Sequence, residues 1–258
     1  MKWSIILFLV PAHHNLCGQS FQLAPPILKY SSAFFKDSVV LSILFDQPGA
    51  KIRYTTNGSD PGENELPYKE KIILHSSAII KARTFGQSFK PSEVVTAIFF
   101  RDGKTIRRIN HTKPADAYSS SNPRLLHDNL GGFPDFRNGQ WLGFNRDSVL
   151  FEIILEKEEK ISSLMINMLR DENNWIFLPD QISVFVESPG KNSYTPMPIS
   201  VQHQAGLTGQ CSFTELLLEK SIHTTGIRVF IRPLASIPKG HPGEGKPGWL
   251  FVDEIKVN

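Results

Sequence analysis

The sequence predicts an all-β protein in which a small antiparallel β-sandwich is followed by a larger β-sandwich of the jelly-roll type. Short apolar runs rich in β-branched and aromatic side chains recur along the chain, and each is bounded by turn residues. The 18 Gly and 18 Pro residues are spread through the sequence, which suits many short strands joined by turns. No region of the second half keeps the apolar period of about 3.6 residues that an amphipathic helix needs.

Length and charge limit the class of protein. A chain of 258 residues accommodates one large domain or two small ones. Its formal net charge of +3 is small and no block of Lys and Arg occurs, so nucleic acid is not the partner that the composition implies. After the amino-terminal segment, no stretch approaches the roughly 20 apolar residues of a transmembrane segment.

The amino-terminal segment Met1–Gly18 is typical of an export signal. Lys2 gives it a positive start, and Ile5–Val10 forms a short apolar core. The chain is therefore expected in the periplasm, at the surface or outside of a bacterial cell. Lipidation at Cys17 is an alternative to cleavage near the end of the segment. If Cys17 is removed with the signal, Cys211 has no partner for an intrachain disulfide.

Short strand candidates fill the first half of the chain. They are Val39–Phe45, Lys51–Thr55, Ile72–Leu74, Ala78–Phe85 and Val94–Phe100. The turns between them include Gln47-Pro48-Gly49, where Pro fixes φ and Gly tolerates a positive φ. This pattern predicts a small antiparallel sandwich over residues 21–101. Charged pairs and a Ser run then interrupt the strands, so residues 102–112 are expected to be a linker.

One motif in the first half is specific. The run Ile52–Pro61, which reads IRYTTNGSDP, is followed by Tyr68, by Ile72–Leu74 and by the strand Ile79–Arg83. This succession resembles the small β-sandwich module at the carboxyl terminus of chitobiase and β-hexosaminidase-type enzymes. The resemblance implies a module without catalytic residues.

The second half contains further strand candidates. They are Val149–Leu155, Ile161–Leu169, Ile182–Glu187, Phe213–Leu218, Ile227–Arg232 and Trp249–Val257. In the fifth of these, Ile227, Val229 and Ile231 alternate with larger or charged residues, which predicts one buried face. Another strand, Trp249–Val257, alternates similarly except where Asp253-Glu254 interrupts it. The simplest architecture is a two-sheet jelly roll of about eight strands over residues 113–258.

A second resemblance covers this half. It rests on Leu126-His127-Asp128, on Asp135–Phe144, on Trp175–Pro179, on Arg228 and on Gly248–Ile255. These segments resemble the discoidin, or coagulation factor 5/8 type C, family, which includes many carbohydrate-binding modules. The order of the two modules resembles the carboxyl-terminal end of some bacterial family-20 β-hexosaminidases. The catalytic barrel of such enzymes has no room in this chain.

The stretch Leu125–Phe144 is expected to be an ordered loop around a cation. It is rich in Gly, carboxylates and amides, and Ca²⁺ takes six to eight oxygen ligands from such loops. The discoidin resemblance implies a structural Ca²⁺ held by Asp128 and Glu254, with Asp135 as a third ligand. The family usually has Gly after this Asp, whereas Asn129 follows it here. The alternative is that Asp128 caps a turn and Glu254 is a surface residue.

A sugar-binding face is the second expectation. Aromatic walls with a few polar groups are typical of small-molecule sites. The side chains expected to bind carbohydrate are Arg137, Trp141, Trp175, His241 and Trp249. Trp141 and Trp249 lie in apolar contexts, where a Trp is more often part of the core. The loop Pro238–Gly248 is the best exposed candidate, because its composition cannot pack as a core.

No motif for hydrolysis is present: the sequence lacks GxSxG, HExxH and CxxC. We therefore expect an exported, non-catalytic accessory protein that binds glycans with N-acetylhexosamine or galactose-type sugars. A glycoside hydrolase is an expected partner. The alternatives are a protein-interaction or structural module, or a detached accessory region of a β-hexosaminidase.

Overall fold

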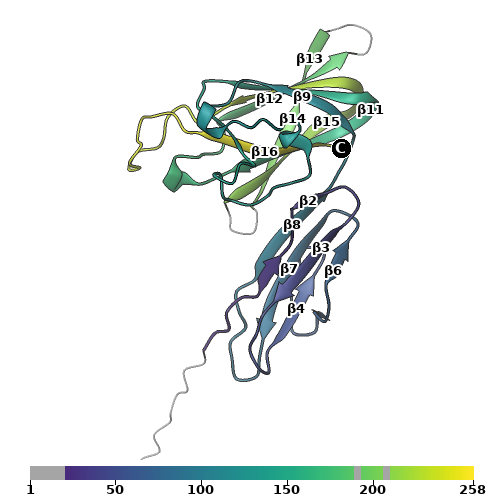
Figure 1. The fold of residues 1–258 in the computed structure, drawn as a ribbon, viewed down its shortest axis with the longest axis vertical. Helices are drawn as coiled ribbons and strands as arrows, with labels where there is room; N and C mark the ends of the chain where they lie inside the picture. The colour runs from purple at the N-terminus through teal and green to yellow at the C-terminus, as the bar shows by residue number, and fades with distance from the viewer. Residues whose placement is uncertain (1–20, 189–192, 206–209) are drawn as a thin grey trace, which may run out of the picture.

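The computed structural model describes residues 21–188, 193–205 and 210–258, which form two β domains joined end to end (Figure 1). The predicted export signal Met1–Gly18, including Cys17, lies outside the described residues. Within the described part of the chain, no helix combines the length and the apolar composition needed to cross a membrane.

The first domain is the predicted small sandwich. Its strands are β1 (Ile27–Lys29), β2 (Phe34–Phe35), β3 (Val39–Leu44), β4 (Lys51–Thr55), β5 (Leu66–Pro67), β6 (Ile72–Leu74), β7 (Ala78–Phe85) and β8 (Val95–Arg101). They form two sheets with the orders β1-β3-β6 and β2-β8-β7-β4-β5. Along β3, Val39, Leu41 and Ile43 are buried while the residues between them are not, so one face of the three-stranded sheet packs on the core.

The second domain holds the remaining strands. They are β9 (Ile106–His111), β10 (Leu142–Phe144), β11 (Val149–Leu169), β12 (Gln181–Ser188), β13 (Ser193–Met197), β14 (Ile199–Ala205), β15 (Cys211–Arg232) and β16 (Leu250–Val257). Three short 3₁₀ turns accompany them: η1 (Asp116–Tyr118), η2 (Leu125–His127) and η3 (Glu172–Asn174).

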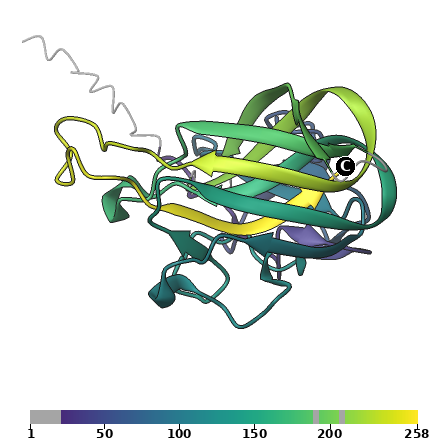
Figure 2. The same ribbon diagram turned by 90° about the horizontal axis from the view of Figure 1, so that it is seen from above.

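Strands β11 and β15 are long because each contributes to both layers of the sandwich (Figure 2). The first part of β11 pairs with β9 and its last part with β16, and register shifts separate the two parts. Strand β15 pairs with β14 at its start and with β12 at its end. The resulting layers are β9-β11-β15-β12-β13 and β10-β16-β11-β15-β14. The all-β fold with a two-sheet jelly roll is therefore confirmed.

Two details concern the predictions for this domain. Ile227, Val229 and Ile231 are fully buried between the layers, as their alternation predicts. The linker expected at residues 102–112 is shorter than predicted. Residues 106–111 form β9, which pairs with Phe151–Leu155 of the second domain. The sequence Ile106–His111 has only two apolar residues in six, so its edge-strand character was not visible in its hydrophobicity.

The two domains share a small core at their junction. Its members are Ala33, Phe34 and Ile98 from the first domain and Met165 and Phe213 from the second. The rings of Phe34 and Phe213 meet edge to face at 5.9 Å, and the amide of Ala33 donates to the carbonyl of Gly131 at 3.2 Å. The loop Leu125–Phe144 therefore touches the first domain as well as the carboxyl-terminal strand.

Two glycines make this close approach possible. Gly131 and Gly132 have positive φ values of 133° and 81°. A Cβ on Gly132 would lie 2.5 Å from the Cβ of Ala33, and a Cβ on Gly131 would collide with the carboxylate of Asp253. The loop reaches the first domain because these two positions carry no side chain.

We predict that Gly132→Ala lowers the free energy of unfolding by about 2–5 kcal/mol, because it adds a steric clash to the cost of a positive φ. Gly139→Ala is the matched control, since Gly139 has a φ of 82° but open space around it. In Gly139→Ala the free energy of unfolding is expected to fall by only about 1–2 kcal/mol. Urea denaturation of both variants measures the difference, and equal losses would contradict the close contact at the junction.

Candidate functional site

A β-bulge shapes the last strand. In the pairing of β16 with β11, Glu254 lies opposite Asn167 and Val252 opposite Met168, so Asp253 is an extra residue. The bulge shifts the alternation by one residue, and as a result Leu250, Val252, Ile255 and Val257 all face the core. This explains why Asp253-Glu254 interrupts the apolar pattern of the sequence.

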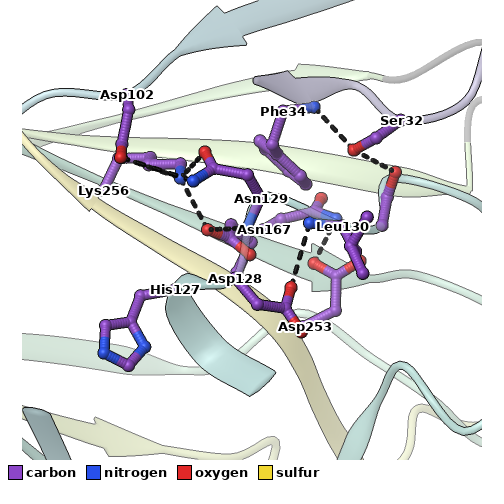
Figure 3. Close-up of polar contacts among 12 residues, drawn as sticks. Ser32, Phe34, Asp102, His127, Asp128, Asn129, Leu130, Asn167, Asp253 and Lys256 are labelled. Atoms are coloured by element: carbon purple, nitrogen blue, oxygen red, sulfur yellow. Dashed lines mark hydrogen bonds and ion pairs between the residues drawn. The ribbon is translucent and has the colours of Figure 1, made fainter. Parts of the chain in front are cut away.

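Asp253 fastens the glycine loop from inside. Its carboxyl group is fully buried and accepts a hydrogen bond from the amide of Gly132 at 2.9 Å. It accepts a second from the side chain of Asn167 at 2.6 Å, and Figure 3 labels both residues of this pair. Burial raises the pKa of Asp253 to about 8, and these two donors oppose the shift. No solvent reaches the group, so it acts as a structural anchor rather than as a general acid or base.

Two of the three predicted calcium ligands instead fix turns of the loop. The Asp128 carboxylate accepts from the amide of Leu130 at 2.9 Å and from the side chain of Asn122 at 2.9 Å. Asp135 is exposed and accepts from the amide of Arg137 at 3.0 Å. The bonds from the amides of Leu130 and Arg137 are the local backbone to side-chain bonds by which Asp stabilises turns. The structure therefore supports the turn-capping alternative for Asp128.

The third predicted ligand, Glu254, lies in the interior rather than on the surface. It is 0% exposed, and its Oε1 atom lies 2.6 Å from the ammonium of Lys256. Burial raises the pKa of Glu254, whereas the ammonium of Lys256 opposes that rise. The second carboxylate oxygen, Oε2, is buried without a hydrogen-bond partner.

Calcium does not fit this donor set. Among the described residues, no group of three or more His, Cys, Asp or Glu side chains is placed to hold a metal ion. Ca²⁺ needs six to eight oxygens, whereas the oxygens next to Glu254 surround an ammonium that is already positive. Calcium in this domain stays a prediction, but the predicted ligands Asp128, Asp135 and Glu254 do not form its site.

The prediction that Trp141 binds sugar is wrong. Trp141 is 2% exposed and packs in a small cluster with Phe136, Leu169 and Ile176. Its indole N–H donates to the carbonyl of Phe133 at 3.0 Å, so the polar edge of the ring is also used inside the protein. The apolar neighbours of Trp141 in the sequence indicated this outcome.

His241 has a structural role in the loop Pro238–Gly248. Its Nδ1 accepts from the amide of Gly243 at 3.0 Å, which requires the proton on Nε2. Nε2 then donates to the carbonyl of Glu172 at 2.9 Å. Both ring nitrogens are therefore occupied, and His241 ties the loop to η3 instead of offering hydrogen bonds to a sugar.

Trp175 also contacts the loop Pro238–Gly248. It follows η3 with a φ of 63°, a conformation that non-glycine residues rarely adopt. The ammonium of Lys246 lies 5.1 Å from its ring, and a Cβ on Gly243 would lie 3.0 Å from it. The ring of Trp175 is half-buried under the loop, which projects from the end of the domain opposite the carboxyl terminus (Figures 1 and 2).

Trp249 and Arg137 lie in a second aromatic group, which the sequence did not reveal as a unit. Half-buried Tyr118 joins them, because its ring lies 5.4 Å from Trp249 and 5.9 Å from Phe136. The guanidinium of exposed Arg137 stacks over Phe136 at 4.1 Å. Three segments distant in sequence thus form one surface, which we call the Tyr118 surface: Tyr118, Arg137 and Trp249, supported by Phe136. Tyr118 was missed because it stands alone among polar residues.

The one described cysteine is not a nucleophile. Cys211 is 1% exposed at the junction, and its thiol lies 3.5 Å from the carbonyl of Gly132. Burial raises the pKa of the Cys211 thiol, and the nearby Asp253 raises it further. A thiol that stays protonated and inaccessible does not carry out covalent catalysis.

One comparison with known proteins concerns the first domain. The model of the "Chitobiase/beta-hexosaminidase C-terminal domain" family matches residues 30–96, which confirms the resemblance of that domain. No curated protein matches the chain.

Solved structures similar to this chain include three that concern carbohydrate. A pectin-binding carbohydrate-binding module has a TM-score of 0.34 and 15% identity, with 60% of this chain and 92% of that chain covered. The CBM32 of AlyQ in complex with 4,5-unsaturated mannuronic acid has a TM-score of 0.35 and 10% identity, with coverages of 60% and 96%. A GH29 fucosidase of Ruminococcus gnavus in complex with fucose has a TM-score of 0.32 and 11% identity, with 58% of this chain and 24% of that chain covered.

We predict that Cys211 resists alkylation by iodoacetamide in the folded protein and reacts once denaturant is added. The buried, protonated thiol lacks both access and thiolate character. Mass spectrometry of the peptide that contains Cys211 measures the modification. Rapid labelling of the native protein would contradict a closed junction between the domains.

Proposed function

We propose that this chain is an exported, non-catalytic accessory protein that binds carbohydrate at the Tyr118 surface of its second domain. The observation that carries the proposal is the meeting of Tyr118 and Trp249 at an interplanar angle of 82°, beside the stacked guanidinium of Arg137. A sugar ring has an apolar C–H face and a rim of hydroxyls. Half-exposed aromatic rings contact the first, and the fixed N–H groups of Arg donate to the second.

The family match of the first domain supports our choice of ligand class and of partner. Its family is described as the carboxyl-terminal domain of chitobiase and β-hexosaminidase. We therefore propose N-acetylhexosamine sugars as the first ligands to test, followed by galactose-type sugars, and a glycoside hydrolase as the partner. The proposal of a non-catalytic role is supported by the burial of Asp253, Glu254 and Cys211, since none of these three groups is open to a substrate.

Protein interaction is the second candidate function, because one face of the first domain exposes apolar side chains. Ile27 pairs across strands with Leu44, and Val40 pairs with Ile73. Their exposed fractions are 66%, 47%, 45% and 58%, respectively. A contiguous exposed apolar patch is typical of surfaces that contact another protein or domain.

We predict that Tyr118→Ala and Arg137→Ala each weaken glycan binding by at least about tenfold, because each removes a central contact of the Tyr118 surface. The measurement is a glycan array followed by calorimetric titration of the best oligosaccharide. Phe89→Ala is the matched control, since Phe89 is an aromatic residue 40% exposed in the first domain. It should bind like the unchanged protein.

Two outcomes would count against this proposal. An array without any bound glycan would favour protein interaction through the Ile27, Leu44, Val40 and Ile73 face. Glycan binding that survives both substitutions would place the sugar at another surface of the molecule.

A further inference from the structure

A lysine lies where the discoidin resemblance implies a metal ion. Lys256 is 1% exposed in the last strand, which makes it one of the largest fully buried side chains of the protein. Lysine is almost never buried to this degree unless it is paired, because removing its charge from water is costly. The partners of this ammonium therefore show what it does.

Three oxygens from three different segments surround the Lys256 ammonium. They are Oε1 of Glu254 at 2.6 Å, Oδ1 of Asn129 at 2.5 Å and Oδ1 of Asp102 at 3.0 Å. Figure 3 shows Asn129 and Asp102 next to Lys256. An ammonium has three N–H donors, so each donor has one acceptor. The side chain of Asn129 also donates to Asp102 at 3.3 Å, which closes the group into a ring.

The residue after Asp128 connects this arrangement to the sequence. Where the family usually has Gly, this chain has Asn129, whose φ is 65°. Asn tolerates this left-handed conformation better than most residues do. Unlike Gly, it also brings a carbonyl oxygen to the ammonium. The departure from the family pattern and the buried lysine thus belong to the same structural feature.

The acceptors tie the loop to both domains. Glu254 belongs to β16, Asn129 to the loop Leu125–Phe144, and Asp102 to the connection between the domains, where its amide donates to the carbonyl of Phe35 at 2.7 Å. The ring of Phe34 lies 5.8 Å from the ammonium and covers it from the first domain. A cation at this point therefore holds the last strand, the loop and the junction together.

From these contacts we infer that Lys256 supplies the structural cation of this domain, so that the loop closes without a divalent metal. The ammonium lies 2.6 Å from the carboxyl of Glu254 and 3.0 Å from that of Asp102, and a Ca²⁺ beside it would be repelled. The donors and acceptors match in number, and the group is sealed from water on the side of Phe34.

The first test is the melting temperature of the unchanged protein with excess EDTA and with excess CaCl₂. We expect no shift in either condition. A fall with EDTA or a rise with CaCl₂ would overturn the inference. It would show that a metal binds, for example at the unpaired Oε2 of Glu254 and the unpaired Oδ1 of Asn167.

The second test is Lys256→Met, which keeps the length of the side chain and removes its charge. We expect the melting temperature to fall by on the order of 10 °C, because Glu254 is left as an uncompensated buried carboxylate. Lys104→Met is the matched control: its ammonium lies 3.5 Å from Glu159 in a pair that is partly exposed, so little change is expected. Equal shifts in the two variants would overturn the inference.

Two further variants keep the test decisive if Lys256→Met does not fold. In Glu254→Gln/Lys256→Met both charges are absent, so the double variant should regain part of the loss. Asp102→Ala removes one acceptor that is 33% exposed, and it should speed hydrogen exchange of residues 129–132 relative to Lys104→Met. The ring of contacts would be contradicted if the melting temperature of the double variant fell by the sum of the falls in the two single variants. It would also be contradicted if the hydrogen exchange of residues 129–132 were unchanged in Asp102→Ala.

Discussion

The last strand carries three ionisable side chains into the interior, and the arrangement of the second domain follows from their need for partners. Asp253, Glu254 and Lys256 are each 1% exposed or less. Buried charges are tolerated only where hydrogen bonds and opposite charges replace water. Asp253 takes its donors from the glycine loop and from β11, while Lys256 takes its acceptors from the loop, from the interdomain connection and from its own strand.

The bulge in β16 makes this arrangement possible. Without the extra residue, Asp253 would stand in strict alternation with its neighbours and the apolar side chains after it would turn away from the core. With it, Leu250, Val252, Ile255 and Val257 stay in the core while both carboxylates reach the loop. The same strand thus serves the packing of the jelly roll and the attachment of Leu125–Phe144.

The middle of the loop Leu125–Phe144 is buried, whereas Arg137 in its later part is exposed. Its middle, at Gly131-Gly132, is held between Ala33 and Asp253 and is closed to ligands. Its later part presents Arg137 next to Tyr118 and Trp249, at the surface we propose for carbohydrate. If this surface binds carbohydrate as proposed, the anchored middle holds the exposed part in place, which lowers the entropy lost when a ligand orders that surface.

The sequence by itself determined the all-β class, the two successive sandwiches, the buried face Ile227, Val229 and Ile231, and the resemblance of the first domain to the chitobiase/β-hexosaminidase carboxyl-terminal module. The fold class and the buried face follow from local periodicity and turn chemistry, which a strand carries wherever it packs, whereas the resemblance rests on the motif Ile52–Pro61. The discoidin resemblance also implied a link between Leu125–Phe144 and the carboxyl-terminal strand, through a Ca²⁺ held by Asp128 and Glu254. The sequence did not reveal β9, because an edge strand with few apolar residues has no clear pattern.

Only the tertiary structure decided the chemistry of the sites. Trp141 and Trp249 have similar apolar neighbours, yet one is buried and the other half-exposed, because burial depends on what packs from distant segments. The ring nitrogens of His241 are occupied by Gly243 and by Glu172, which is far from it in sequence. In the sequence, Lys256 is an ordinary charged residue of a strand. Its ammonium has three acceptors only because Asp102 and Asn129 approach it in addition to Glu254. Contacts between distant segments determine the charge balance of an interior, and spacing along the chain does not record them.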